Sequence, residues 1–152
     1  MLLPDNRLLV TAVYSSGSAA IQIDRNADGG FASKLLWKNR NLKTKFSNAI
    51  VRGDYAYGLD SIILACIDTR TGDVQWKGGR FGHGQLLQVN DLTLIISETG
   101  ELVLMQLTPQ GEKELGRFQA LNDKTWNTLA IKGNRLLIRN DRQAACFELP
   151  TQ

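Results

Sequence analysis

The sequence predicts an all-β fold, a partial β-propeller of about four blades with essentially no helix. Turn signals recur along the 152 residues at a period of about forty, which is the range of propeller blades. Within each repeat, short apolar segments of strand length are separated by Gly, Asp or Asn. No stretch keeps apolar residues at helical spacing over three turns, so long amphipathic helices are excluded.

The repeat is clearest in the short turn before the second strand of each unit. Its members, Asn6, Asp54, Asp91 and Asn134, follow one another at steps of 48, 37 and 43 residues. Two further landmarks keep the same register less strictly. The hairpin after the third strand begins with Asp24, Asp68, Gln106 and Glu148, and the unit ends with an aromatic residue in Trp37, Trp76 and Phe118. Three landmarks in one register predict four equivalent units.

The second and third units each predict a complete four-stranded meander. The strands are 46–51, 55–59, 62–68 and 74–76 in the second unit, and 85–89, 92–97, 102–107 and 113–118 in the third.

The outer units each lack a strand. The first predicts 8–14, 19–24 and 33–37, and the fourth predicts 125–131, 135–139 and 144–149. We therefore expect one domain over 1–152, with two complete blades flanked by two three-stranded ones, at approximately 6–40, 45–78, 83–119 and 124–150.

The best-preserved hairpin runs from Cys66 to Trp76 and reads Cys-Ile-Asp-Thr-Arg-Thr-Gly-Asp-Val-Gln-Trp. Asp68 and Thr71 suit a tight turn because their side chains bond local backbone amides, and Gly72 supplies a positive φ. Trp76 closes the second strand with a large apolar body and one N–H that needs a partner when buried. Cys146 lies two residues before Glu148, as Cys66 lies two residues before Asp68. We therefore expect the two cysteines at equivalent positions of the second and fourth blades, with the third blade between them.

This segment resembles the Ala-x-Asp-x-x-Thr-Gly-x-x-x-Trp signature of the quinoprotein-type (pyrroloquinoline-quinone-like) β-propeller repeat, with Cys66 in the Ala place. The family includes quinone-dependent alcohol and glucose dehydrogenases and the propeller lipoprotein of outer-membrane barrel assembly. The resemblance implies that the aromatic residue fastens one blade to a small residue of its neighbour. The structural repeat residues are then Trp37, Cys66, Asp68, Thr71, Gly72, Trp76 and Phe118.

The same resemblance raises a question of completeness, because family members usually have seven or eight blades. Four blades predict either a half-ring that another chain completes, for which a homodimer is the leading hypothesis, or a fragment of a longer propeller. The open ends of a half-ring would expose sheet faces and edges, which favours association. No signal peptide is seen in this sequence, and the resemblance to a mostly exported family implies an exported or periplasmic parent.

Two classes of function follow. One is a non-catalytic module that serves as a binding or assembly scaffold, since a fold alone carries no activity. The other is the C-terminal part of a quinone-dependent oxidoreductase. The dehydrogenases of the family carry adjacent cysteines beside pyrroloquinoline quinone, and this chain has none. We expect no bound cofactor, and the sequence shows no assembled catalytic constellation.

Two segments resemble ligand sites. Asp24, Asn26 and Asp28 match the opening of a calcium loop, but position twelve is Leu35 instead of Glu, so we expect a polar hairpin turn and no bound metal, with a calcium site as the alternative. Arg80 and the only histidine, His83, lie in a glycine-rich connection, which we expect to be structural; the alternative is that both face the central channel and bind an anion.

Charge and hydropathy limit the classes of partner that the chain is expected to have. The chain has 43% hydrophobic and 22% charged residues and a formal charge of +3. A basic patch surrounds Trp37, formed by Lys34, Lys38, Arg40, Lys43 and Lys45. It lacks any nucleic-acid motif and is expected to be a solvated blade connection, so nucleic acid is not an expected partner. No apolar run is long enough to cross a bilayer, so no membrane insertion is expected.

Overall fold

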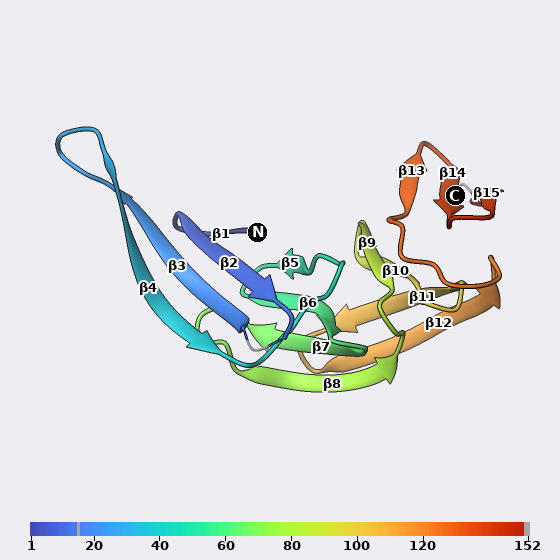
Figure 1. The fold of residues 1–152 in the computed structure, drawn as a ribbon, viewed down its shortest axis with the longest axis horizontal. Helices are drawn as coiled ribbons and strands as arrows, with labels where there is room; N and C mark the ends of the chain where they lie inside the picture. Colours follow the sequence, from blue (N-terminus) through green and yellow to red (C-terminus); the bar gives the residue numbers. More distant parts are fainter. Residues whose placement is uncertain (15, 151–152) are drawn as a thin grey trace.

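The computed structural model describes residues 1–14 and 16–150, which form fifteen β-strands in four antiparallel sheets, with no helix among them. The sheets follow one another along the chain as an open arc (Figure 1). The first contains β1 (Leu2–Leu3), β2 (Arg7–Ala12), β3 (Gly17–Arg25) and β4 (Phe31–Asn39). The second contains β5 (Ile50–Arg52), β6 (Tyr55–Asp60), β7 (Ile63–Asp68) and β8 (Val74–Arg80).

The third sheet contains β9 (Gln85–Val89), β10 (Leu92–Ile96), β11 (Glu101–Thr108) and β12 (Gly111–Gln119), and the fourth contains β13 (Ala130–Lys132), β14 (Arg135–Arg139) and β15 (Ala144–Glu148). In every sheet the strands pair in sequence order, so each sheet is a meander. The first strand of each lies on the inner side of the arc, and β4, β8 and β12 lie on the outer side (Figure 1). These are the blades of a partial propeller, and the predicted all-β fold is confirmed.

The first blade differs from the prediction in having four strands. Leu2 and Leu3 pair with Leu8 and Arg7, so a short inner strand precedes the first turn. Asp5 and Asn6 both adopt positive φ, at 59° and 56°, which reverses the chain within very few residues. A two-residue strand has no alternation of apolar and polar residues that a sequence can reveal. The fourth blade has three strands, as the sequence predicts.

The inner strands of the second and fourth blades are shorter than predicted. They begin at Ile50 and Ala130, four and five residues later than expected, because the preceding segments form irregular blade connections. Phe46, which the prediction placed in a strand, has a φ of 61°. A residue with this left-handed backbone conformation cannot continue an extended strand.

The core consists of three apolar clusters, each between two neighbouring blades. Leu9 of the first blade packs with Ala56 and Ile67 of the second. On the opposite face of the second blade, Tyr57 and Cys66 pack towards the third blade. The third cluster joins the third and fourth blades and includes Leu94, Ile96, Leu102, Leu136 and Ile138. Because side chains alternate between the two faces of a strand, each inner blade supplies both of its faces to the core.

No helix in the described part of the chain is long and apolar enough to cross a membrane.

Candidate functional site

The junction between the first two blades is built around Trp37. Its indole Nε1 donates a hydrogen bond to the carbonyl oxygen of Thr69, at 3.0 Å. The amides of Asn39 and Asn41 both donate to the carbonyl oxygen of Gly72, at 2.9 and 2.8 Å. Gly72 has a φ of 80°, and a Cβ added to it would lie 2.6 Å from Cε3 of the Trp37 ring. The hairpin therefore needs glycine here, both for its turn and for close contact with the tryptophan.

The hairpin that receives Trp37 is held by Asp68. Its carboxylate accepts a hydrogen bond from the backbone N–H of Arg70, at 2.8 Å, and pairs with the Arg70 guanidinium. These contacts with Arg70 lower the pKa of the Asp68 carboxyl. Thr71 Oγ1 accepts from the backbone N–H of Asp73, at 3.2 Å. The predicted turn residues thus stabilise their own hairpin and present its carbonyls to the neighbouring blade.

The junction between the second and third blades repeats this arrangement. Trp76 Nε1 donates to the carbonyl oxygen of Thr108, at 2.8 Å, across the same sequence separation as Trp37 and Thr69. Arg52 adds hydrogen bonds to two carbonyls of the third blade, and its guanidinium lies 4.7 Å from the Tyr57 ring centroid. Cys66 is fully buried beneath Trp76, and burial raises the pKa of its thiol to about 12. This thiol is a packing group.

The junction between the third and fourth blades lacks the indole. Trp37 stands opposite Ala20 and Trp76 opposite Cys66, and the same register in the third blade places Gly116 opposite Leu104. Phe118 stands two residues further on, opposite Leu102. Its ring meets Phe147 of the fourth blade edge to face, with centroids 5.3 Å apart. This junction therefore relies on a ring contact, without the hydrogen bond that Trp37 and Trp76 supply.

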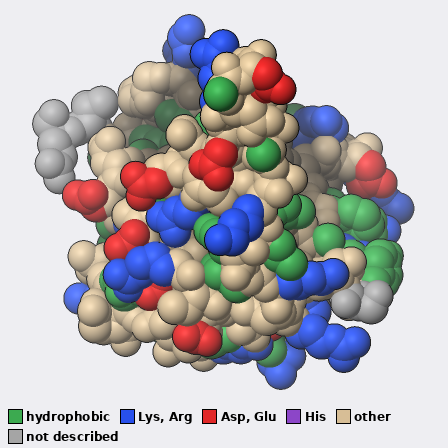
Figure 2. All heavy atoms as spheres, turned by 90° about the vertical axis from the view of Figure 1, so that its left-hand side faces the viewer, with side chains coloured by type: hydrophobic (Ala, Val, Ile, Leu, Met, Phe, Trp, Pro, Cys, Tyr) green, Lys and Arg blue, Asp and Glu red, His purple; other side chains and the backbone are tan. Residues whose placement is uncertain are grey.

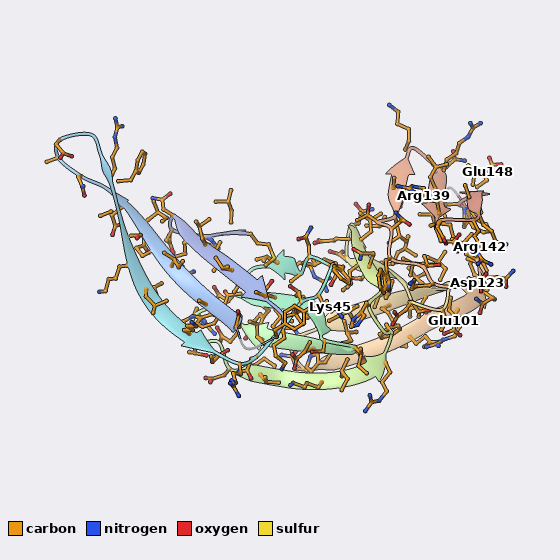
Figure 3. All side chains as sticks on the ribbon, viewed as in Figure 1. Lys45, Glu101, Asp123, Arg139, Arg142 and Glu148 are labelled. Carbon is orange, nitrogen blue, oxygen red and sulfur yellow. The ribbon has the colours of Figure 1, made fainter. Side chains whose placement is uncertain are left out.

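Each terminal blade leaves one sheet face without a neighbouring blade. On the fourth blade, Leu137 and Cys146 occupy the register positions of Tyr57 and Cys66. Leu137 is 48% exposed and Cys146 is exposed, whereas Tyr57 is 2% exposed. We call the surface formed by Leu137, Cys146, Ala144 and Arg139 the fourth-blade open face. Arg139 and Glu148 lie at this end of the arc (Figure 3).

The first blade has the complementary open face. It is formed by Leu8, Val10, Ile21, Ile23 and Leu35, which alternate with the residues that contact the second blade. Val10 is 49% exposed and Leu35 is 58% exposed. Seen from this end of the molecule, hydrophobic side chains reach the surface between charged groups of both signs (Figure 2). We call this surface the first-blade open face.

The calcium hypothesis concerns the hairpin between β3 and β4. Asp28 Oδ1 accepts a hydrogen bond from the backbone N–H of Gly30, at 2.9 Å, and Asn26 exchanges backbone hydrogen bonds across the turn. Asp24 Oδ1 accepts from the Gln22 amide, at 3.2 Å. Among described residues, no group of three His, Cys, Asp or Glu side chains is placed to hold a metal. The three residues have roles in a polar hairpin, and calcium binding stays an untested alternative.

The residues of this chain do not reproduce the cysteine pair that the family resemblance associates with quinone. Cys66 is buried between the second and third blades, and Cys146 is exposed on the fourth. A whole blade separates them, so the two thiols cannot form one site.

Of the two residues expected at the channel, only His83 joins a cluster. Arg80 is exposed at the end of β8, the outermost strand of its blade, and no hydrogen bond or ion pair joins it to His83 in the described residues. The His83 ring centroid lies 6.2 Å from those of both Phe46 and Trp126, which are themselves 5.0 Å apart. We call Phe46, His83 and Trp126 the ring cluster. One ring comes from each of the three blade connections.

Glu98 lies beside the ring cluster and holds two of its members. One carboxylate oxygen accepts a hydrogen bond from Trp126 Nε1, at 2.8 Å, and the other accepts from the backbone N–H of His83, at 3.1 Å. Burial alone would raise the pKa of the Glu98 carboxyl, but these two hydrogen bonds hold it below its ordinary value. The sequence reasoning missed Phe46, Glu98 and Trp126. The available signal was an aromatic residue one or two positions after a lysine in two of the connections.

No protein-family model matches the chain, and no curated protein matches it. Among solved structures, it is similar to BamB from Moraxella catarrhalis, with a TM-score of 0.61 and 16% sequence identity over 95% of this chain and 40% of that protein. This likeness agrees with the fold of a partial β-propeller. The propeller is also similar to the computationally designed protein Ika8, with a TM-score of 0.51 and 10% identity over 97% of this chain and 57% of Ika8. The propeller thus spans less than two thirds of either protein, and at these identities the likeness shows the fold alone.

Proposed function

We propose that the chain is a non-catalytic binding or assembly module, whose half-ring of blades is completed by another chain, in the first instance a second copy. The observation that carries the proposal is the pair of open faces. Leu137 and Cys146 sit where Tyr57 and Cys66 meet a following blade, yet they meet none. An apolar sheet face at the end of an array is covered in a stable assembly.

The two open faces lie at opposite ends of the array of blades. The fourth-blade open face of one copy can therefore meet the first-blade open face of another copy as neighbouring blades meet within the chain. The first-blade open face is a row of aliphatic side chains, and the fourth-blade open face has Leu137 at its centre with Arg139 beside it. Packing the fourth blade of one copy on the first blade of another, twice about a two-fold axis, closes a ring of eight blades. If the sequence is part of a longer polypeptide, further blades of that polypeptide take the same positions.

The titratable groups with shifted pKa values support a structural role. Asp60 is nearly buried and pairs with Lys43 and Lys77, at 2.6 and 2.5 Å. Burial alone would raise the pKa of its carboxyl, but the two lysines lower it. Tyr57 and Cys66 have raised pKa values because they are buried between blades. Each of these groups ties a connection or a blade in place.

The test is the oligomeric state of the purified chain and three variants, by light scattering coupled to size-exclusion chromatography at micromolar concentrations. Leu137→Asp and Leu35→Asp each place a charge on one open face, and both should give monomers. Leu115→Asp is the matched control, because Leu115 is 45% exposed on β12, away from both faces. It should leave the dimer intact.

Mixing the two monomeric variants sharpens the test. A pair formed by Leu137→Asp and Leu35→Asp copies has both substitutions in one contact and none in the other, so association should be partly restored. A wild-type chain that is monomeric at these concentrations contradicts the proposal for a second copy. Equal dimerisation of all three variants contradicts the assignment of the faces.

A further inference from the structure

We infer that the ring cluster and its two flanking lysines form a docking surface for an extended acidic peptide segment that carries an aromatic side chain. The surface lies on the blade connections and not on the open sheet faces. The inference is therefore independent of how the ring is completed. It gives the proposed binding module one specific kind of partner.

The first observation is the exposure of rings that contact one another. Phe46 is 61% exposed and Trp126 is 37% exposed, although their centroids are 5.0 Å apart. They belong to connections 80 residues apart in the sequence, so the fold brings them together. Neighbouring exposed aromatic rings, rimmed by polar groups, are typical of the centre of a protein interface.

The second observation is backbone strain at the exposed rings. Phe46 has a φ of 61° and Tyr14 has a φ of 65°, a conformation that bulky side chains rarely adopt. Both side chains point to solvent, with Tyr14 79% exposed. The strained backbone at Phe46 is held by a hydrogen bond from the Gln85 amide to its carbonyl oxygen, at 2.8 Å. Strain that is not offset by burial of the ring indicates a functional constraint.

The third observation is the placement of positive charge. Lys45 Nζ lies 5.3 Å from the centroid of Phe46 and 5.9 Å from that of Tyr14, and Lys124 Nζ lies 4.4 Å from that of Trp126. The nearest acid of the cluster, Glu98, uses both oxygens to hold Trp126 and His83. Lys124 is also attracted to Glu98, but neither lysine forms an ion pair within the described residues, so both ammonium groups can attract carboxylates from a partner.

A groove beside Phe46 receives the partner's side chain. It has a volume of about 410 Å³ and is lined by residues 11–14 and 44–48, which include Tyr14, Lys45 and Phe46. Lys45 lies near the end of β2, between the first and second blades (Figure 3). An aromatic side chain in this groove contacts two rings, while a neighbouring carboxylate reaches Lys45.

The geometry favours a peptide over single-stranded nucleic acid, which also uses aromatic rings and lysine. Stacked bases need free ring faces, one after another along the strand. Here Lys45 and Lys124 lie over the faces of Phe46 and Trp126, and the rings form one compact cluster.

Binding is measured by fluorescence anisotropy with a labelled synthetic peptide of sequence EDFEDFED. Saturable binding is expected, and Phe46→Ala should weaken it by about tenfold or more, since a tenfold loss corresponds to one central contact. Lys45→Ala and Lys124→Ala should each weaken it by about three- to tenfold, with a steeper loss at low salt. The peptides EDAEDAED and QNFQNFQN should both bind more weakly.

The matched controls are Phe31→Ala and Lys34→Ala. Phe31 is 75% exposed and Lys34 is exposed, and both lie on β4 in the first blade. Neither change should alter peptide binding. Phe46→Ala is expected to fold normally, because the ring is largely exposed, and an unchanged melting curve checks this. Phe46→Gly provides a second variant, in which the positive φ is unstrained.

Three results overturn the inference: no saturation at 1 mM peptide, equal affinity of wild type, Phe46→Ala and Lys45→Ala, or tighter binding of a ten-residue oligothymidylate than of the peptide. The last result assigns the surface to nucleic acid. The Leu137→Asp variant is measured in parallel and should still bind the peptide, which separates this surface from ring completion.

Discussion

The second and fourth blades share a strand register, and they differ in what covers them. Tyr57 and Cys66 of the second blade are buried against the third, while Leu137 and Cys146 at the same places are exposed. The difference shows that burial in this fold is set by the neighbouring blade as much as by the residue. It also explains why Leu is tolerated where the second blade has a large aromatic ring.

The largest expected difference concerns side-chain truncation at this shared position. Tyr57→Ala removes a ring from a closed core and should cost about 3–5 kcal/mol of unfolding free energy. Leu137→Ala should cost less than about 1 kcal/mol in the monomer, measured below the concentration at which the chain dimerises, because its side chain is half exposed there. Urea denaturation of both variants measures the two costs. Equal costs would show that the fourth-blade open face is covered.

The reactivity of the two cysteines tests the same comparison between the covered face of the second blade and the open face of the fourth. Cys146 is exposed, whereas Cys66 is fully buried with its thiol pKa raised to about 12. A thiol-reactive disulfide reagent at pH 8 should modify Cys146 at least about a hundredfold faster than Cys66. Single variants Cys66→Ser and Cys146→Ser assign the two rates. Ring completion should slow the Cys146 reaction as the chain concentration rises.

A smaller difference is expected at the end of the second strand of each blade. Asp60 in the second blade and Asn140 in the fourth are both nearly buried and both bond to the preceding connection. Asp60→Asn should cost about 2 kcal/mol at pH 7, between the values for exposed and buried ion pairs. The pKa of the Asp60 carboxyl is lowered by folding. Its stabilisation is therefore present above the ordinary Asp pKa of about 4 and is lost as pH falls through the lower folded value.

The cost of Asp60→Asn should accordingly shrink below about pH 4, as measured by urea denaturation across pH. Asn140→Ala serves as the neutral comparison, and its cost should not depend on pH in this range. A pH-independent cost of Asp60→Asn would contradict the ionised state of the carboxyl.

The smallest effect is expected from a substitution that makes the junction between the second and third blades resemble the junction between the third and fourth. Trp76→Phe keeps a ring but removes the N–H that bonds Thr108, so it should cost about 1 kcal/mol. The third and fourth blades already lack this hydrogen bond, with Gly116 at the corresponding position. Thermal unfolding compares Trp76→Phe with Phe118→Leu, which removes only a ring contact. A larger loss for Phe118→Leu would mean that ring contacts dominate the junctions.

The sequence alone was sufficient for the meanders, because turn residues and strand lengths are local properties. It placed the hairpin of Asp68 and Gly72 and the fourth blade's three strands. It could not find β1, which is two residues long, or the register of Phe118. The first three blades each have a bulge at this point of the outer hairpin, and the residue that stands at the Trp position of the third blade is Gly116. Bulges depend on pairing across strands, which spacing along the chain does not record.

The ring cluster was beyond sequence reasoning for a different reason. Phe46 and Trp126 are 80 residues apart, and their contact exists only because the fold brings two blade connections together. The positive φ of Phe46 is equally invisible, since bulky residues seldom adopt it. Of the three rings, the sequence pattern points only to His83, through the glycines around it.

The tryptophan contacts between blades have a direction. Trp37 reaches forward to the hairpin of the second blade, and Trp76 reaches forward to that of the third. Trp126 lies in a blade connection and takes no part in this pattern, because it bonds Glu98 of the preceding blade. Blades joined in this way have a head and a tail, so copies of the chain add to one another with a single polarity. Contacts of that kind close into a ring only when the rotation per copy divides a full turn; otherwise they continue into an open filament. The curvature of four blades therefore decides between a finite particle and a polymer.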